Sequence, residues 1–253
     1  MSRVLAVVAH PDDIEFVMAG TLLLLAKCGW EVHYFNIANG CCGSMEQSRQ
    51  ETARQRLVES QQAAASLPAV FHPPICDDLH IFYDAETLSK VSHVVRKANP
   101  SIVLTHSPVD YMEDHQNTCR LAVTAAFSKN MPNFYSLPPI EAVTGDVAIY
   151  HAQPHGNVSI FGEPVPPDFA IDITEVIDAK ARMLACHQSQ QGWLDVTQKM
   201  SSYTQTMFEL GKGVAKFVGA DGYCEGWRQR NSLGFGAASW DPLREALAPY
   251  CRS

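Results

Sequence analysis

The segment V-L-A-V-V-A-H-P-D-D-I-E, at residues 4–15, constrains the fold more than any other part of the sequence. It begins with a continuous apolar run, which is typical of a strand covered on both faces in a parallel sheet. Pro11 cannot donate a ladder hydrogen bond, so this strand should end at about His10. The next residues have the composition of a helix that stops at a glycine. We therefore expect His10, Asp12 and Asp13 in a loop at the carboxyl end of the strand, where open α/β sheets bind ligands.

Strands and helices alternate along the rest of the chain. Apolar runs predict strands at 31–39, 102–105, 147–150 and 170–173. Runs of helix formers predict helices at 45–67, 85–98, 116–127 and 198–210, and a further helix at 176–187 with Thr174 as its N-cap. The proline-rich 68–78 is expected to be a connection, and 110–115 a polar loop. This alternation predicts one α/β domain over residues 1–253, with a Rossmann-like, mostly parallel sheet and helices on both faces.

Composition excludes several classes of protein. The net charge of −8, with no Lys/Arg-rich run, disfavours a nucleic acid partner. No apolar stretch is long enough for a membrane span. The first apolar run ends in a proline and two acids, which is unlike a secretory signal, so we expect a cytoplasmic protein. The eight cysteines are scattered without a C-x-x-C pair, which favours free thiols over disulfides or a zinc knuckle.

The loop after the first strand has two interpretations. An imidazole and a carboxylate three residues apart can share one divalent cation, and the neighbouring carboxylate can then face the water that the metal polarises. Alternatively, Asp12 or Asp13 only caps the next helix, and His10 is incidental polar surface. The short motif alone leaves both interpretations open.

A catalytic zinc usually has three protein ligands and an open position for water. His115 is the best third candidate, because it follows the strand at 102–105 and so should lie at the same sheet edge as His10. Asp114 beside it can orient a ligand or a catalytic group. Of the other histidines, we expect His33 and His93 to be structural and His72 and His80 to be solvated, while His106, His151, His155 and His187 remain candidates for the site.

Four segments together resemble the LmbE/PIG-L family of zinc-dependent N-deacetylases. They are A-H-P-D-D at 9–13, G-C-C-G-S at 40–44 followed by Arg56 and Glu59, D-H at 114–115, and K-A-R-M-L-A-C-H-Q-S-Q at 180–190. They cover about the first three quarters of the chain in the family's order. The combination is far more specific than any single segment.

This resemblance implies residue roles and a substrate class. His10, Asp13 and His115 would be the Zn²⁺ ligands, and Asp12 the general base, with Asp114 as a supporting catalytic residue. The implied substrate is a small amino-sugar derivative, such as an N-acetylglucosaminyl conjugate, from which acetate is released. Related proteins often assemble, so the resemblance also implies a homo-oligomer.

One position departs from the family pattern. The family usually has a second histidine three residues before the metal-binding histidine, and this sequence has Met112 there. A thioether can neither stabilise an oxyanion nor protonate a leaving group. We expect another donor to replace it, because loss of one oxyanion donor costs about 100- to 1000-fold in rate. The candidates are Tyr111, His106, His151, His155 and His187.

Three alternatives stay open from the sequence. The first is an amidase of the same fold that acts on a larger acyl group or a thiol conjugate. The second is a nucleotide-binding module, although H-P-D-D stands where a glycine-rich phosphate loop would be needed. The third is a non-catalytic metal-binding protein. Near the predicted loops, Arg49, Arg54 and Arg56 are expected on a solvated helix face, and Trp193 and Trp227 in the core or a subunit contact.

Overall fold

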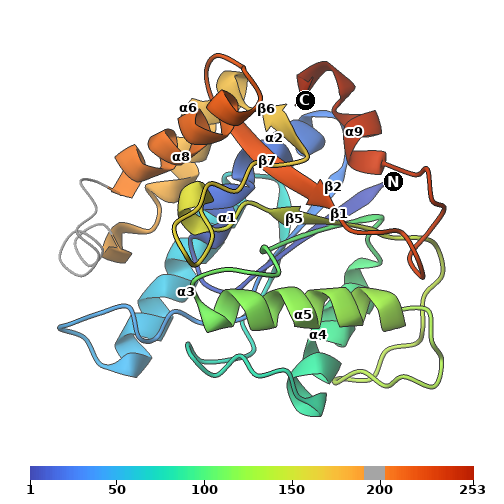
Figure 1. The fold of residues 1–253 in the computed structure, drawn as a ribbon. Coiled ribbons are helices and arrows are strands. Elements are labelled where there is room, and N and C mark those ends of the chain that lie inside the picture. Colours follow the sequence, from blue (N-terminus) through green and yellow to red (C-terminus); the bar gives the residue numbers. More distant parts are fainter. Residues whose placement is uncertain (191–202) are drawn as a thin grey trace.

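The computed structural model describes residues 1–190 and 203–253, and its strands form one sheet (Figure 1). The order is β3-β2-β1-β4-β5-β7-β6-β8. The first five of these pair in parallel, whereas β7 runs antiparallel to both β5 and β6. The strands are β1 (Arg3–Val8), β2 (Glu31–Asn36), β3 (Ala69–His72), β4 (Ile102–Thr105), β5 (Ala148–Ala152), β6 (Phe169–Asp172), β7 (Cys224–Gln229) and β8 (Cys251–Arg252).

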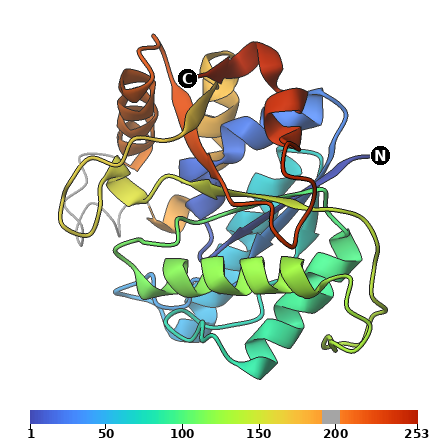
Figure 2. The same ribbon diagram turned by 45° about the vertical axis from the view of Figure 1, so that its right-hand side comes forward.

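Helices cover both faces of the sheet (Figure 2). One face packs against α4 and α5, and the other mainly against α2, α3, α6 and α8. The helices are α1 (Asp13–Val17), α2 (Ala19–Lys27), α3 (Arg49–Ala65), α4 (Ala85–Ala98), α5 (Glu113–Ser128), α6 (Ile177–Leu184), α8 (Tyr203–Phe217) and α9 (Pro242–Ala246). None of the described helices is long and apolar enough to cross a membrane. The predicted α/β class with a mostly parallel sheet is confirmed.

The first strand shows why its apolar run does not alternate with polar residues. Val4, Ala6 and Val8 contribute to the core on one face, and Leu5 and Val7 to the core on the other. All five side chains are fully buried. Successive side chains of a strand point to opposite faces, so a strand between two helical layers is apolar at every position.

Several predicted elements need correction. The proline-rich stretch contains an edge strand, β3, in which His72 is buried against His33 instead of being solvated. The first predicted helix is two helices, because Met18 has non-helical dihedral angles (φ −148°, ψ −5°). Thr174 is not an N-cap; it begins a 3₁₀ turn, and its hydroxyl accepts a hydrogen bond from the Tyr223 N–H.

The helix expected to begin after His115 begins earlier. It starts at Glu113, so Asp114 and His115 lie in its first turn and not in a loop. Two acidic residues in a first turn are favourable beside the positive end of the helix dipole. At the C-terminal end, β7, β8 and α9 form from the tail for which no element was predicted. Trp227 is fully buried in β7, as expected, whereas Trp193 and the start of the predicted helix at 198–210 lie outside the described residues.

A buried ion pair connects three elements beneath the site. The Lys180 ammonium of α6 donates to Glu225 of β7 at 2.7 Å, and both side chains are almost wholly buried. Glu225 also accepts hydrogen bonds from the N–H groups of Gly20 and Thr21 and from the Thr21 hydroxyl in α2. Breaking a buried pair on one side leaves an uncompensated charge, so this contact constrains how α2 and α6 pack.

Candidate functional site

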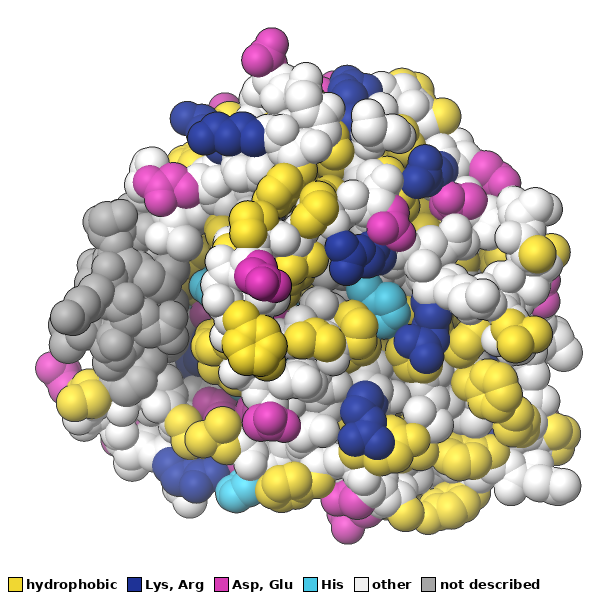
Figure 3. Space-filling view, in the orientation of Figure 1, with side chains coloured by type: hydrophobic (Ala, Val, Ile, Leu, Met, Phe, Trp, Pro, Cys, Tyr) yellow, Lys and Arg dark blue, Asp and Glu magenta, His cyan; other side chains and the backbone are white. Residues whose placement is uncertain are grey.

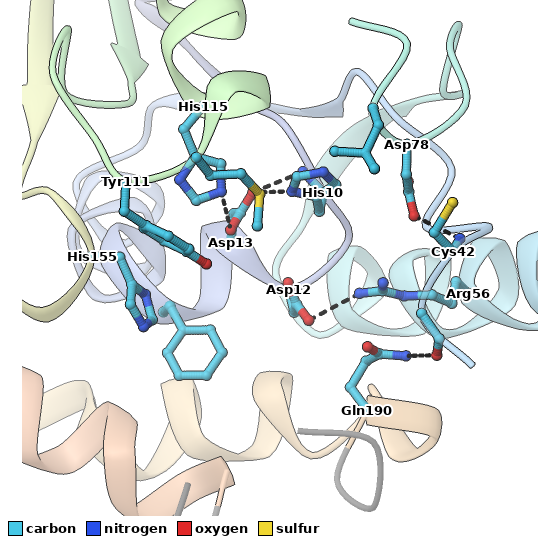
Figure 4. Close-up of a pocket in the computed structure, with 14 residues that line it drawn as sticks. His10, Asp12, Asp13, Cys42, Arg56, Asp78, Tyr111, His115, His155 and Gln190 are labelled. Carbon is cyan, nitrogen blue, oxygen red and sulfur yellow. Dashed lines mark hydrogen bonds and ion pairs between the residues drawn. The ribbon is translucent and has the colours of Figure 1, made fainter. Parts of the chain in front are cut away.

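The carboxyl ends of β1 and β4 bring two distant segments together. The two strands are parallel neighbours, paired from Val4–Ile102 to Val7–Thr105. The residues that follow each strand therefore meet at one edge of the sheet. A cavity of about 250 Å³ lies there, and its lining includes His10, Asp12, Asp13 and His115 (Figure 4).

Three predicted ligands converge in this cavity. The ligand atoms of His10, Asp13 and His115 all lie within 4.8 Å of one another. His10 Nδ1 is 3.5 Å from Asp13 Oδ2, and His115 Nε2 is 3.5 Å from Asp13 Oδ1. Two ligands of one tetrahedral zinc, each about 2.1 Å from the ion, would be about 3.4 Å apart. The side chains present therefore fit a zinc-sized cation.

Each histidine is oriented by a carboxylate on its other nitrogen. His10 Nε2 lies 2.9 Å from Asp114, and His115 Nδ1 lies 2.9 Å from Asp110. A metal-binding histidine usually donates its second N–H in this way, which fixes the tautomer and the ring orientation. Asp114 thus contacts both His10 and the Leu79 N–H, and it can fix the orientation of the His10 ring. Asp110 was missed by the sequence analysis, because an aspartate five residues before a histidine has no distinctive spacing.

The carboxylates around His10 and His115 favour the protonated, positively charged form of each ring. Burial lowers the pKa of each ring, but hydrogen bonds and charges from Asp114 and Asp13 outweigh it and raise the pKa of His10 to about 9. Asp13 and Asp110 likewise raise the pKa of His115 to about 10. A metal at this site would replace protons on the two rings, so its binding would release protons.

The pKa values of the two adjacent carboxylates shift in opposite directions. Burial would raise the pKa of Asp13, but the charges of His115 and His106 hold it well below the usual range. Burial raises the pKa of Asp12, and the positive charge of Arg56 offsets part of that rise. Neighbouring carboxylates that differ in this way suit different roles, one as a permanent anion and the other as a proton acceptor.

The backbone of Asp12 is in an uncommon conformation. Its φ is +103°, in a region that residues other than glycine rarely adopt. Two buried groups hold its Oδ2 atom: Arg56 Nη2 at 2.9 Å and the Tyr203 hydroxyl at 2.7 Å. The described residues make no hydrogen bond to Oδ1, so this oxygen can serve a reacting molecule. Strained backbone at a functional position is often part of the site's preorganisation.

Arg56 differs from its prediction. It is 4% exposed and contacts Asp12 and the Pro11 carbonyl, whereas Arg54 is on the solvated face as expected. A Cβ atom on Gly40, where φ is +76°, would overlap the Arg56 side chain. Because Gly40 has no side chain, it leaves the space through which Arg56 reaches Asp12. Tyr203 also donates to Asp12, and no motif in the sequence pointed to it.

The wall near Met112 offers two donors. Of the proposed replacements for the usual histidine, Tyr111 and His155 line the cavity. The Tyr111 hydroxyl points into it, and its ring lies against both His115 and His155 (Figure 4). The other three candidates do not line it: His106 stacks behind His115 with ring centroids 4.1 Å apart, His151 lines another cavity, and His187 bonds to Glu15.

The chain is an α/β protein with a His/Asp/His group that could hold a metal ion at the carboxyl ends of parallel strands. Residues 5–126 match the family model described as PIG-L: GlcNAc-PI de-N-acetylase. The part of the chain that carries the candidate site therefore matches the PIG-L/LmbE family. Diacetylchitobiose deacetylase from Thermococcus kodakarensis is 28% identical over 197 residues, which are 75% of this chain and 70% of that protein.

The comparisons also find a second activity in proteins similar to this chain. The 4-oxalmesaconate hydratase of Pseudomonas putida is 27% identical over 225 residues, covering 85% of this chain and 82% of that protein. The solved structure of 4-carboxy-2-hydroxymuconate hydratase from Pseudomonas putida is 25% identical, with a TM-score of 0.75, and the match covers 95% of this chain and 99% of that one.

Proposed function

We propose that the chain is a zinc-dependent N-deacetylase acting on an N-acetylated amino-sugar derivative. The observation that carries this proposal is the convergence of His10 Nδ1, Asp13 and His115 Nε2 beside Asp12 Oδ1, to which no described residue donates a hydrogen bond. Deacetylases among its relatives support the reaction type and the sugar class. We further propose that residues 1–253 act as one catalytic domain in a cytoplasmic homo-oligomer.

The geometry suggests a division of roles among the side chains. A zinc ion held by His10, Asp13 and His115 would polarise the amide carbonyl and lower the pKa of a water molecule. Asp12 accepts a proton from the attacking water and returns it to the departing amine. Arg56 and Tyr203 hold Asp12 in position for both transfers.

Tyr111 is proposed as the donor that replaces the usual histidine. Burial raises the pKa of its hydroxyl, which therefore stays protonated and can donate to the developing oxyanion. We expect Tyr111→Phe to lower kcat by about 100-fold with little change in KM, since a donor used only in the transition state contributes to kcat. Steady-state acetate release measures this effect. Tyr135→Phe, at a residue outside the cavity, is the matched control, and an unchanged kcat in Tyr111→Phe would leave His155 as the donor.

The substrate class is tested by measuring both products. The zinc-loaded protein is incubated with N-acetylglucosamine, diacetylchitobiose and N-acetylglucosaminyl conjugates, and with matched amides of longer acyl groups. Acetate and free amine should appear in equal amounts. Release of longer acids alone would favour the larger-acyl alternative, and no release from any amide would contradict amide hydrolysis.

A hydratase is the second candidate, and a specific observation favours it. The sequence match to the hydratase covers 85% of this chain and the sequence match to the deacetylase covers 75%, and Met112 stands where the usual deacetylase pattern has a histidine. A Lewis acid and a general base can also add water to a conjugated double bond. The same protein is therefore tested with 4-oxalmesaconate, whose conjugated absorbance is lost on hydration. Loss of absorbance without amide hydrolysis would replace the deacetylase proposal.

A further inference from the structure

A second cavity, of about 190 Å³, lies beside the ends of β4, β5 and β7. None of the residues that line it belongs to the cavity at the metal group. Most of the described residues that line it have polar side chains: Ser107, His151, Gln153, Asp168, Arg228, Gln229 and Arg230. The face shown in Figure 3 carries several Lys and Arg side chains near its middle. A polar cavity of this size has room for a small ligand or several water molecules.

His151, which lines this cavity, has a buried acceptor without a partner among the described residues. Its Nδ1 lies 2.9 Å from the backbone carbonyl oxygen of His106, so Nδ1 carries the proton and donates it. Nε2 is then the acceptor of the neutral ring. It is buried, and it has no hydrogen-bond partner among the described residues. A buried acceptor without a partner lowers the stability of the folded chain. A ligand that donates a hydrogen bond to Nε2 would remove this cost.

The two arginines provide positive charge at the same place. Arg228 is paired with Asp168 at 3.4 Å and donates to the Pro166 carbonyl. Arg230 makes no ion pair or side-chain hydrogen bond with the described residues. Burial lowers the pKa of the His151 ring, and the positive charges of Arg230 and Arg228 lower it further. The ring is therefore neutral. Because Asp168 is paired with Arg228, the charge of Arg230 makes the net charge of the lining positive.

We propose that this cavity binds a small oxyanion that also carries a hydroxyl, as in hydrogen phosphate or a hydroxycarboxylate. The hydroxyl donates to His151 Nε2, and the anionic oxygens accept from Arg230 and Arg228. Guanidinium groups suit such anions because their planar N–H groups match carboxylate and phosphate oxygens. This site does not depend on the reaction proposed at the metal group.

Matched pairs of anions test the proposal by calorimetry with the metal-loaded protein. At mildly alkaline pH, hydrogen phosphate and sulfate both carry a charge of about −2, but only hydrogen phosphate has an O–H group. Tartrate and succinate form a second pair of equal charge, with and without hydroxyls. Hydrogen phosphate, tartrate or both should bind at least about tenfold more tightly than the partner without a hydroxyl. The two pairs separate a phosphate ligand from a hydroxycarboxylate ligand.

Variants assign this binding to the cavity. Arg230→Gln should weaken the preferred anion at least about tenfold. Arg182→Gln, at an exposed arginine on α6, and Asp13→Asn, at the metal group, should not weaken it. His151→Asn keeps a donor for the His106 carbonyl and should remove the preference for the hydroxylated anion. The proposal is overturned if none of the four anions binds, if Arg230→Gln binds as well as the unchanged protein, or if Asp13→Asn abolishes binding.

Discussion

Asp12→Asn should lower kcat for amide hydrolysis by about 100- to 10,000-fold while the protein keeps its metal. Asparagine has nearly the size of aspartate and can still contact Arg56 and Tyr203 through its amide oxygen. It cannot accept a proton from water at neutral pH. Because Asp12 Oδ2 is already held by two donors, the loss falls on the proton transfer and not on the position of the loop.

The kcat of Asp12→Asn is compared with its zinc content and with the kcat of a control variant. Bound zinc is measured by elemental analysis on the same sample used for kinetics. Asp221→Asn, at an exposed aspartate away from the cavity, should leave both quantities unchanged. Turnover near the original value in a metal-loaded Asp12→Asn protein would show that Asp12 is not the base.

Removal of a metal ligand should have the second large effect. Asp13→Ala and His115→Ala should each reduce bound zinc from about one per chain to almost none, and activity should fall with it. Asp13 lies 3.5 Å from a nitrogen of each histidine, so its loss also removes a negative charge that both rings share. Zinc titration of the chelator-treated protein measures the change in affinity.

The carboxylates behind the ligands provide a graded comparison. Asp110→Asn and Asp114→Asn keep the ligands but weaken their orientation, for which losses of about 10- to 100-fold in metal affinity are typical. The ligand variants should therefore be affected more than these two. Full zinc occupancy in Asp13→Ala and His115→Ala would refute the ligand set, and an equal loss in all four variants would refute the assigned order.

The sequence predicted the parts of this molecule that depend on local patterns. The first strand and the loop after it were recognisable because a doubly buried strand is apolar throughout and Pro11 ends its ladder. Helix α4 and strand β4 were predicted with their observed bounds, since each has strong flanking signals. In α4, the side chain of Asp84 caps the helix by accepting from the Thr87 N–H.

Long-range contacts explain what the sequence could not predict. Arg56 was placed on a solvated face because α3 is polar along its length, and only the folded chain shows that it reaches Asp12, 44 positions away. Tyr203 reaches the same carboxylate from 191 positions away. Strand β3 was missed because a short strand beside prolines has little pattern of its own and is stabilised by pairing with β2.

The approach of Arg56 to the glycine loop limits how the cavity can change. Gly40 and Gly43 both face the Arg56 side chain, so a larger residue at either position would displace the group that holds Asp12. Cys42, between them, lines the cavity without such a contact. On this wall, variation that alters which molecule fits can occur at position 42 without displacing Arg56 from Asp12. We therefore expect substitutions that change the substrate to be tolerated at position 42 and not at Gly40 or Gly43.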